Sequence, residues 1–367
     1  MDDMRNVEDR FQLDPYQDWI EREGVPVAED FGVHLHRVET KPWPRFDIKG
    51  AVVHVKGRGD NVSIFLYDLP PGGKTSPRTH MFEEVIFVLE GHGSTQVEAA
   101  DGRKHTFEWG PNSLFSLPLN ARHQHFNASG RERALMAASN NSALLFNLFH
   151  NDEFIFGNPS KFPEREGRDG YFSGEGDFIP RTKGRPVWET NFVPDLTKLE
   201  LTPWKERGAG GSNVFFILAD GNMHAHMSEM PVGTYKKGHR HGPDFHVHCV
   251  TGEGFSILWN EGDQDFVRVD WDHGVVFAPP DQMFHQHFNT SPVPARYLAT
   301  ALGSVRYPMT QARRKLSNKA AVSVKDGGNQ IEYEDQDPRI HRMYLDDMAK
   351  HGAQSRMAEF IDESKYR

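Results

Sequence analysis

Three histidines in the second half of the sequence have the spacing of metal ligands. His239 and His241 stand two residues apart after a glycine turn, and His285 follows the Pro279-Pro280 turn. Side chains at positions i and i+2 of an extended segment point to the same side, so His239 and His241 can offer two imidazoles to one point. A third imidazole from a neighbouring strand would complete a facial set with positions left open for substrate or oxygen. The spacing therefore predicts a metal site on His239, His241 and His285.

The elements that must position these histidines are short apolar runs separated by Gly, Pro, Asn and Asp. Short strands with frequent turn residues are typical of an antiparallel sandwich or barrel. The runs in the first half are 51–55, 63–69, 84–91, 94–99, 105–109 and 113–119, and those in the second half are 213–218, 224–230, 247–254, 256–259, 266–271, 275–280 and 295–302. Helical patterns are found towards the two ends, after Asp14-Pro15 and after Asp337.

The two sets of strands are copies of one unit. His80 and His241 lie 161 positions apart (241 − 80), as do Gly72 and Gly233, and HQHFN occurs both at 123–127 and at 285–289. A nearly constant offset over most of a domain indicates an internal duplication. We therefore expect two similar barrels in tandem.

The first copy departs from the second at the expected metal site. Arg78 stands where the second copy has His239, while His80, Glu84 and His123 are kept. These last three could bind a second metal through two imidazoles and one carboxylate. Alternatively, Arg78 pairs with Glu84, and the positive charge of the guanidinium replaces the metal.

Further residues near the second site are candidates for catalysis. His287 lies on the same strand face as His285 and can act as an acid or base. His246 would become a fourth ligand if a bulge shifted the strand register, and without a bulge it points to the opposite face. Gln282 and Asp244 are expected near the mouth of the site, as contacts for substrate.

The overall composition narrows the class of protein. A net charge of −10 with both signs interspersed argues against a nucleic-acid-binding protein. The start of the sequence lacks the apolar segment of a secretory signal, no apolar run has membrane-spanning length, and Cys249 is the single cysteine. We expect a cytoplasmic protein that binds neither nucleic acid nor membrane.

The chain resembles the cupins, specifically the bicupins. Their first motif is Gly, five residues, His-x-His, three or four residues, Glu, six residues and Gly, and their second is Gly, a proline turn, His, three residues and Asn. Both motifs recur in each half, at 72–91 and 110–127 and again at 233–252 and 274–289, although Phe245 replaces the glutamate in the second half. The resemblance implies an all-β fold of two tandem double-stranded β-helix (cupin, jelly-roll) barrels with short N- and C-terminal helices.

This resemblance also sets the expected domain boundaries. We predict a helical arm, a first barrel with a degenerate metal site, a connector, a second barrel with the metal site, and a tail with a helix. The ranges are 1–32, 33–154, 155–202, 203–310 and 311–367. Cupin barrels commonly associate, so a homodimer or higher homo-oligomer is expected.

The set of His239, His241 and His285 resembles the three-histidine iron sites of ring-cleaving and C–C-cleaving cupin dioxygenases such as gentisate dioxygenase. This implies a divalent metal, Fe(II) first among candidates that include Mn, Zn, Ni and Cu, and a small oxygenated substrate cleaved with O2. The substrate would be a hydroxylated aromatic acid or a dicarbonyl. The alternatives are a redox-neutral isomerase or decarboxylase using Mn, Zn or Ni, and a non-catalytic cupin that binds a small molecule or assists a partner enzyme.

Overall fold

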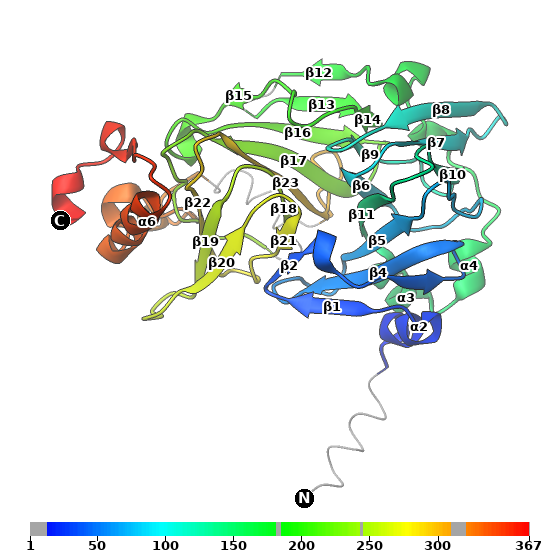
Figure 1. The fold of residues 1–367 in the computed structure, drawn as a ribbon, viewed down its shortest axis with the longest axis horizontal. Helices are drawn as coiled ribbons and strands as arrows, with labels where there is room; N and C mark the ends of the chain where they lie inside the picture. Colours follow the sequence, from blue (N-terminus) through cyan, green and yellow to red (C-terminus); the bar gives the residue numbers. More distant parts are fainter. Residues whose placement is uncertain (1–12, 181–184, 243–244, 310–320, 367) are drawn as a thin grey trace, which may run out of the picture.

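Strands are the main regular secondary structure of the residues that the structure describes, and they form two barrels side by side (Figure 1). The structure is a computed structural model that describes residues 13–180, 185–242, 245–309 and 321–366. The all-β fold class of two tandem jelly-roll barrels with short terminal helices is confirmed.

The first barrel has a large sheet and a small sheet. The large sheet has the order β1-β4-β5-β11-β6-β9-β14 with β3 beside β4, and the small sheet has the order β10-β7-β8. Side chains from both sheets, such as Phe65 and Ile86 on one and Phe107 and Trp109 on the other, share one buried core. The strands are β1 (Val27–Asp30), β3 (Lys41–Trp43), β4 (Ile48–Val55), β5 (Ser63–Leu69), β6 (Glu84–Glu90), β7 (Gly93–Glu98), β8 (Lys104–Trp109), β9 (Leu114–Phe115), β10 (Arg122–Asn127), β11 (Ala134–Asn140) and β14 (Phe192–Val193).

The second barrel repeats this arrangement. Its large sheet has the order β12-β13-β16-β17-β23-β18-β21-β2 with β15 beside β16, and its small sheet has the order β20-β19-β22. Val247 and Phe277 from the large sheet meet Leu258 and Trp271 from the small sheet in its core. The strands are β2 (Gly32–His34), β12 (Asp177–Ile179), β13 (Val187–Thr190), β15 (Thr202–Pro203), β16 (Ser212–Leu218), β17 (Met223–Met230), β18 (His246–Thr251), β19 (Gly254–Trp259), β20 (Val267–Trp271), β21 (Val275–Phe277), β22 (Phe284–Asn289) and β23 (Ala295–Leu302).

The two barrels exchange short strands. β2, near the start of the chain, pairs with β21 of the second barrel, and β14 pairs with β9 of the first barrel. β1 and β13 occupy equivalent places, since each runs parallel to the first long strand of its own copy, β4 or β16. The ranges predicted as an arm and a connector thus also contain strands of the repeated unit. Strands of two to four residues are too short to show an alternating pattern in sequence.

The barrels meet through equivalent faces of their large sheets. Ser139 on β11 and Thr300 on β23 are equivalent positions 161 residues apart (300 − 139), and their hydroxyls hydrogen-bond at 2.8 Å. A single buried apolar cluster around this contact contains Leu66 and Phe87 from the first barrel and Phe216 and Leu298 from the second. The contact between the barrels is therefore a pseudo-twofold interface with a continuous core.

Four helices of the described residues cover the barrel surfaces. They are α2 (Pro15–Glu23), α3 (Ser142–Phe149), α4 (Asp152–Phe156) and α6 (Pro338–Lys350). The predicted start of α2 is confirmed, because Asp14 accepts a hydrogen bond from the Gln17 N–H. On α6, Ile340, Tyr344 and Met348 are buried in one apolar cluster with side chains of the second small sheet. Among all the residues that the structure describes, no helix is long and apolar enough to cross a membrane.

The asparagine of the second cupin motif anchors a turn in each barrel. Asn127 Nδ2 lies within hydrogen-bonding distance of the carbonyl oxygens of Leu69 at 3.1 Å, Pro70 at 3.0 Å and Glu132 at 2.8 Å. Asn289 makes the equivalent contacts in the second barrel. One amide thus joins the end of a large-sheet strand to the loop after β10 or β22.

We expect Asn127→Ala to lower the free energy of unfolding by about 3 kcal/mol, because buried carbonyl oxygens would lose their donor. Urea unfolding followed by circular dichroism measures the change, with the exposed Asn260→Ala as control. A loss no larger than that of the control would contradict the anchoring role.

Candidate metal centre

His239 and His285 are held side by side by their own backbones. The His239 N–H donates to the His285 carbonyl at 3.0 Å, and the His285 N–H donates to the His239 carbonyl at 2.8 Å. This two-residue bridge places the ring centroids 4.2 Å apart on residues that are 4% and 1% exposed. The Gly-turn segment before β18 and the strand β22 therefore present the imidazoles of His239 and His285 at one point.

Backbone carbonyls fix the orientation of the rings. His239 Nδ1 donates to the Lys237 carbonyl at 3.0 Å, and His285 Nδ1 donates to the Met283 carbonyl at 3.2 Å. His241 Nδ1 makes the same kind of contact with the Gly242 carbonyl at 2.9 Å. A carbonyl can only accept, so the proton lies on Nδ1 and the Nε2 lone pair is available to a metal.

His287 joins this pair in one group of candidate ligand atoms. One nitrogen each of His239, His285 and His287 lies within 4.8 Å of the others. His241 is half-buried, and its ring centroid lies 4.5 Å from that of His285 and 5.8 Å from that of His239. The structure thus brings His241 beside the group and adds His287, which the sequence suggested as an acid or base.

A buried hydroxyl positions the His287 ring. Its Nδ1 lies 2.8 Å from Ser256 Oγ, and that oxygen accepts a hydrogen bond from Trp271 Nε1 at 3.0 Å. The first barrel repeats the arrangement with His125, Thr95 and Trp109. The second histidine of each HQHFN run is therefore an oriented interior side chain.

The electrostatic environment keeps these imidazoles neutral. Burial lowers the pKa of His239, His285 and His287 well below its usual value, and nearby cationic side chains lower it further. A neutral imidazole is the form that binds a metal. The group therefore fits a divalent cation without first releasing protons.

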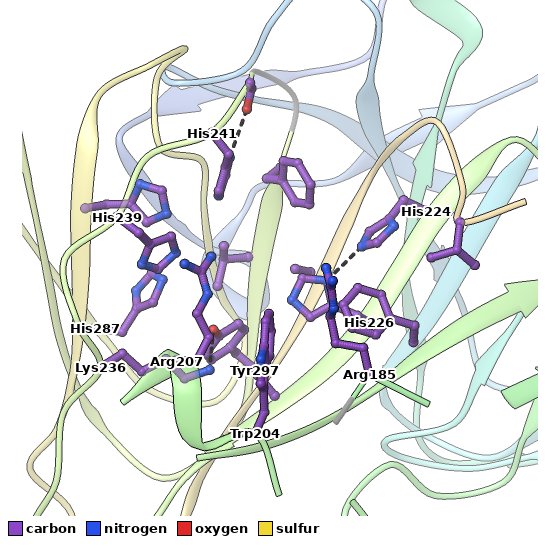
Figure 2. Close-up of a pocket in the computed structure, with 18 of the residues that line it drawn as sticks. Arg185, Trp204, Arg207, His224, His226, Lys236, His239, His241, His287 and Tyr297 are labelled. Carbon is purple, nitrogen blue, oxygen red and sulfur yellow. Dashed lines mark hydrogen bonds between the residues drawn. The ribbon is translucent and has the colours of Figure 1, made fainter. Parts of the chain in front are cut away.

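The histidines form one wall of a cavity of about 350 Å³ (Figure 2). Aromatic and aliphatic side chains make up much of the remaining wall, among them Trp204, Phe215, Phe245 and Val247. Three cationic side chains also line it, those of Arg185, Arg207 and Lys236. The described lining includes no aspartate or glutamate. This combination suits a small anionic molecule with an apolar body.

Two further histidines line the cavity, and sequence reasoning missed them. His224 Nε2 and His226 Nδ1 lie 2.8 Å apart on β17, across the cavity from His239 (Figure 2). Their His-x-His spacing within a strand is the signal that singled out His239 and His241.

His246 does not belong to this site. Its neighbours Phe245 and Val247 line the cavity, whereas His246 is fully buried on the opposite face of β18. Burial there, followed by the nearby His248, Arg58 and His54, lowers the pKa of His246 well below its usual value. The register of β18 does shift, but only between Cys249 and Thr251. Both the catalytic role and the fourth-ligand alternative for His246 are therefore wrong.

Gln282 is also outside the cavity. Its side chain is exposed and donates to Asp281 at 3.1 Å, because a left-handed backbone (φ 58°) turns it outward. Its backbone N–H donates to the His241 carbonyl at 3.0 Å. The predicted substrate contact is wrong, and the residue instead supports the segment that carries His241. Asp244 lies outside the described residues.

The first barrel has the predicted group of His80, Glu84 and His123, with ligand atoms within 4.8 Å of one another. His80 Nε2 lies 3.4 Å from Glu84 Oε2, and the Tyr67 hydroxyl donates to Glu84 Oε1 at 2.6 Å. Burial alone would raise the pKa of Glu84, but His80, Arg78 and Tyr67 together hold it at about 2. The carboxylate is therefore ionised.

Arg78 does not form the predicted ion pair with Glu84. Its guanidinium carbon lies 4.5 Å from the ring centroid of Phe46 and 4.8 Å from that of Tyr67, and its three guanidinium nitrogens have no hydrogen-bond partner within the described residues. Two aromatic faces hold the guanidinium, which explains why it does not reach the carboxylate. Its guanidinium still places positive charge close enough to act on Glu84 and His123.

Comparison with known proteins gives partial matches. A family model described as auxin binding protein matches residues 40–155. Auxin-binding protein T92 of Nicotiana tabacum is 30% identical over 90 residues, which cover 23% of this chain and 46% of that protein. Acireductone dioxygenase of Bacillus mycoides (strain KBAB4) is 46% identical over 44 residues, which cover 12% of this chain and 26% of that protein. The chain thus spans less than half the length of these relatives.

Solved structures also align with this chain. Oxalate decarboxylase of Bacillus subtilis aligns with a TM-score of 0.47 at 12% identity, over 75% of this chain and 78% of that one.

Proposed function

We propose that this bicupin of the cupin superfamily is a metal-dependent enzyme that acts on a small oxygenated anion in its second barrel. The observation that carries the proposal is the convergence of three buried histidine nitrogens within 4.8 Å of one another, at the wall of a cavity of about 350 Å³. A cation site alone would suit a structural metal, but the adjoining cavity gives a ligand access to the metal.

The residues present fit a divalent metal. His239 and His285 form the fixed pair, and His241 or His287 supplies the third imidazole. Imidazole suits Fe, Zn, Cu and Ni, so the donor set supports a transition metal. We propose Fe(II) in preference to Mn, Zn, Ni or Cu. An all-imidazole set leaves the full metal charge uncompensated, which favours an anionic ligand in the open positions.

We further propose that the reaction is a dioxygenase cleavage of a C–C bond in a hydroxylated aromatic acid or a dicarbonyl, with O2 as co-substrate. When bound, a redox-active metal such as Fe(II) would supply Lewis-acid activation of the substrate oxygens and a site for O2. The stretch shared with acireductone dioxygenase supports this class. The protein contributes a cationic wall that stabilises the substrate anion and apolar side chains that exclude water.

A redox-neutral decarboxylase or isomerase using Mn, Zn or Ni is the second candidate. The same imidazoles serve these metals, and the cationic cavity would hold a carboxylate equally well in either reaction. The requirement for O2 separates the two reactions.

We expect the Fe(II)-loaded protein to consume O2 when gentisate or acetylacetone is added, and to place both atoms of labelled O2 in the product. An oxygen electrode and mass spectrometry measure the two quantities. The Zn-loaded protein is the control and is expected to consume none, because Zn²⁺ has no redox chemistry. Product formed without O2 would favour the redox-neutral enzyme. No reaction in any condition while metal stays bound would favour a binding protein.

A further inference from the structure

Lys236 is a buried cation that lines the cavity and lacks a carboxylate partner among the described residues. The residue is 4% exposed, and its Nζ hydrogen-bonds to the Tyr297 hydroxyl at 2.9 Å. Lys236 forms no salt bridge with any residue that the structure describes. Burying an ammonium group without a counter-ion costs free energy. An anionic ligand in the cavity would provide the counter-ion that the described protein residues do not.

The backbone directs this lysine inward. The segment before β18 runs beside β22, and the Lys236 N–H donates to the His287 carbonyl at 3.0 Å. Tyr235 points to the other side, into the apolar cluster under α6, and Lys237 pairs with Glu332 away from the cavity. Lys236 therefore faces the cavity, and its backbone is bonded to His287, one of the candidate metal ligands.

The first barrel has no equivalent cation. The matching position is Thr75 (236 − 161), which is fully buried, and its hydroxyl accepts a hydrogen bond from the His125 N–H at 3.0 Å. The lysine is thus present only in the copy that has the cavity and the three converging histidines. This difference between the copies points to a role in ligand binding, since an internal packing role would be needed in both.

The rest of the cavity indicates the shape of the ligand. Trp204 forms part of the wall, with the guanidinium carbons of Arg185 and Arg207 at 5.7 Å and 5.4 Å from its ring centroid. Phe215 and Phe245 add two more aromatic faces. Flat apolar walls favour a planar body, and cations at several points favour negative charge.

We infer that the cavity binds a planar carboxylate and that Lys236, held by Tyr297, is the residue that binds the carboxylate group. The inference rests on the proposed function, because it names the substrate class of the same cavity. Lys236 donates to one carboxylate oxygen while Tyr297 limits the rotamers of the lysine. An oxygen substituent on the ligand atom next to the carboxylate group is then directed towards His239, His285 and His287.

The test compares a carboxylate with its neutral amide. Calorimetry measures the dissociation constants of salicylate and salicylamide, with formate as the smallest carboxylate probe. The wild-type protein is expected to prefer salicylate, and Lys236→Met is expected to weaken salicylate binding by about 10- to 100-fold. Binding of salicylamide is expected to stay unchanged, since the amide carries no charge for the lysine to neutralise.

Matched variants separate the lysine from general effects. Lys237→Met removes a charge one residue away but outside the cavity, and it is expected to keep the salicylate preference. Tyr297→Phe is expected to weaken salicylate binding less than Lys236→Met does. If Lys236→Met does not fold, Lys236→Gln replaces it, with circular dichroism as the check on folding.

The inference is overturned if Lys236→Met keeps the wild-type preference for salicylate, or if the wild-type protein prefers no carboxylate over its amide. Repeating the titrations after chelation distinguishes this failure from failure of the metal proposal. A charge preference that depends on Lys236 in chelated protein would stand even if the purified protein held no metal.

Discussion

The His285→Ala variant is expected to lose its metal and its activity together. The ring centroid of His285 lies 4.2 Å from that of His239 and 4.5 Å from that of His241, whereas the rings of His239 and His241 are 5.8 Å apart. His285 also contributes a buried nitrogen to the group of ligand atoms within 4.8 Å, so its removal takes away the imidazole that joins the others. Loss of a residue that merely supports a ligand costs about 10- to 100-fold in metal affinity, so loss of a ligand should exceed that range. Elemental analysis of desalted protein and metal titration measure the effect.

Single variants of the neighbouring histidines identify the third ligand. We expect one of the two variants His241→Ala and His287→Ala to lose metal to the same degree as His285→Ala, and the histidine replaced in that variant is the third ligand. The second variant is expected to keep its full metal content and to change only the activity. His246→Ala is the control, because that side chain lies on the opposite face of β18 and should leave metal content unchanged. Full metal content in His285→Ala would refute the site.

Much of the fold and the core of the site could be predicted from the sequence. The offset of 161 between the copies predicted the two barrels. The histidine spacing predicted a metal site on His239, His241 and His285, and the structure groups His239 and His285 with His287 and places His241 beside them. Strand alternation also placed His246 on the far face, although a bulge was kept as an alternative. These features depend on local geometry, which spacing along the chain determines directly.

Other features depend on contacts between distant segments and could not be predicted in this way. The stacking of Arg78 on Phe46 and Tyr67 joins residues on different strands and loops, and no local pattern links them. The exchange of β2 and β14 between barrels involves strands of only a few residues. Lys236 stands three residues before His239 in the sequence, but its proposed role in ligand binding depends on the cavity, which residues from several strands line together.

The first barrel provides a test of why one copy has three converging histidines and the other does not. Arg78 takes the place of His239, and its backbone bridges to His123 as His239 does to His285, with N–H to carbonyl distances of 3.0 Å and 2.9 Å. A histidine at this position would therefore lie beside His123. The substitution would also remove a buried positive charge that opposes a cation near His80 and Glu84.

We therefore expect Arg78→His to give the first barrel a metal site of three histidines and Glu84. In a His285→Ala background, where the second site is disabled, bound metal is expected to rise from none to about one ion per chain. Elemental analysis after loading with Zn²⁺ and desalting measures it. Adding Glu84→Gln should weaken the gained site without abolishing it, because three imidazoles remain, as in the second barrel, but the negative charge of the carboxylate is lost. Metal retained by His285→Ala alone and lost on adding His123→Ala would instead show that His80, Glu84 and His123 bind a cation despite Arg78. No gain with Arg78→His would show that the guanidinium is not what excludes metal.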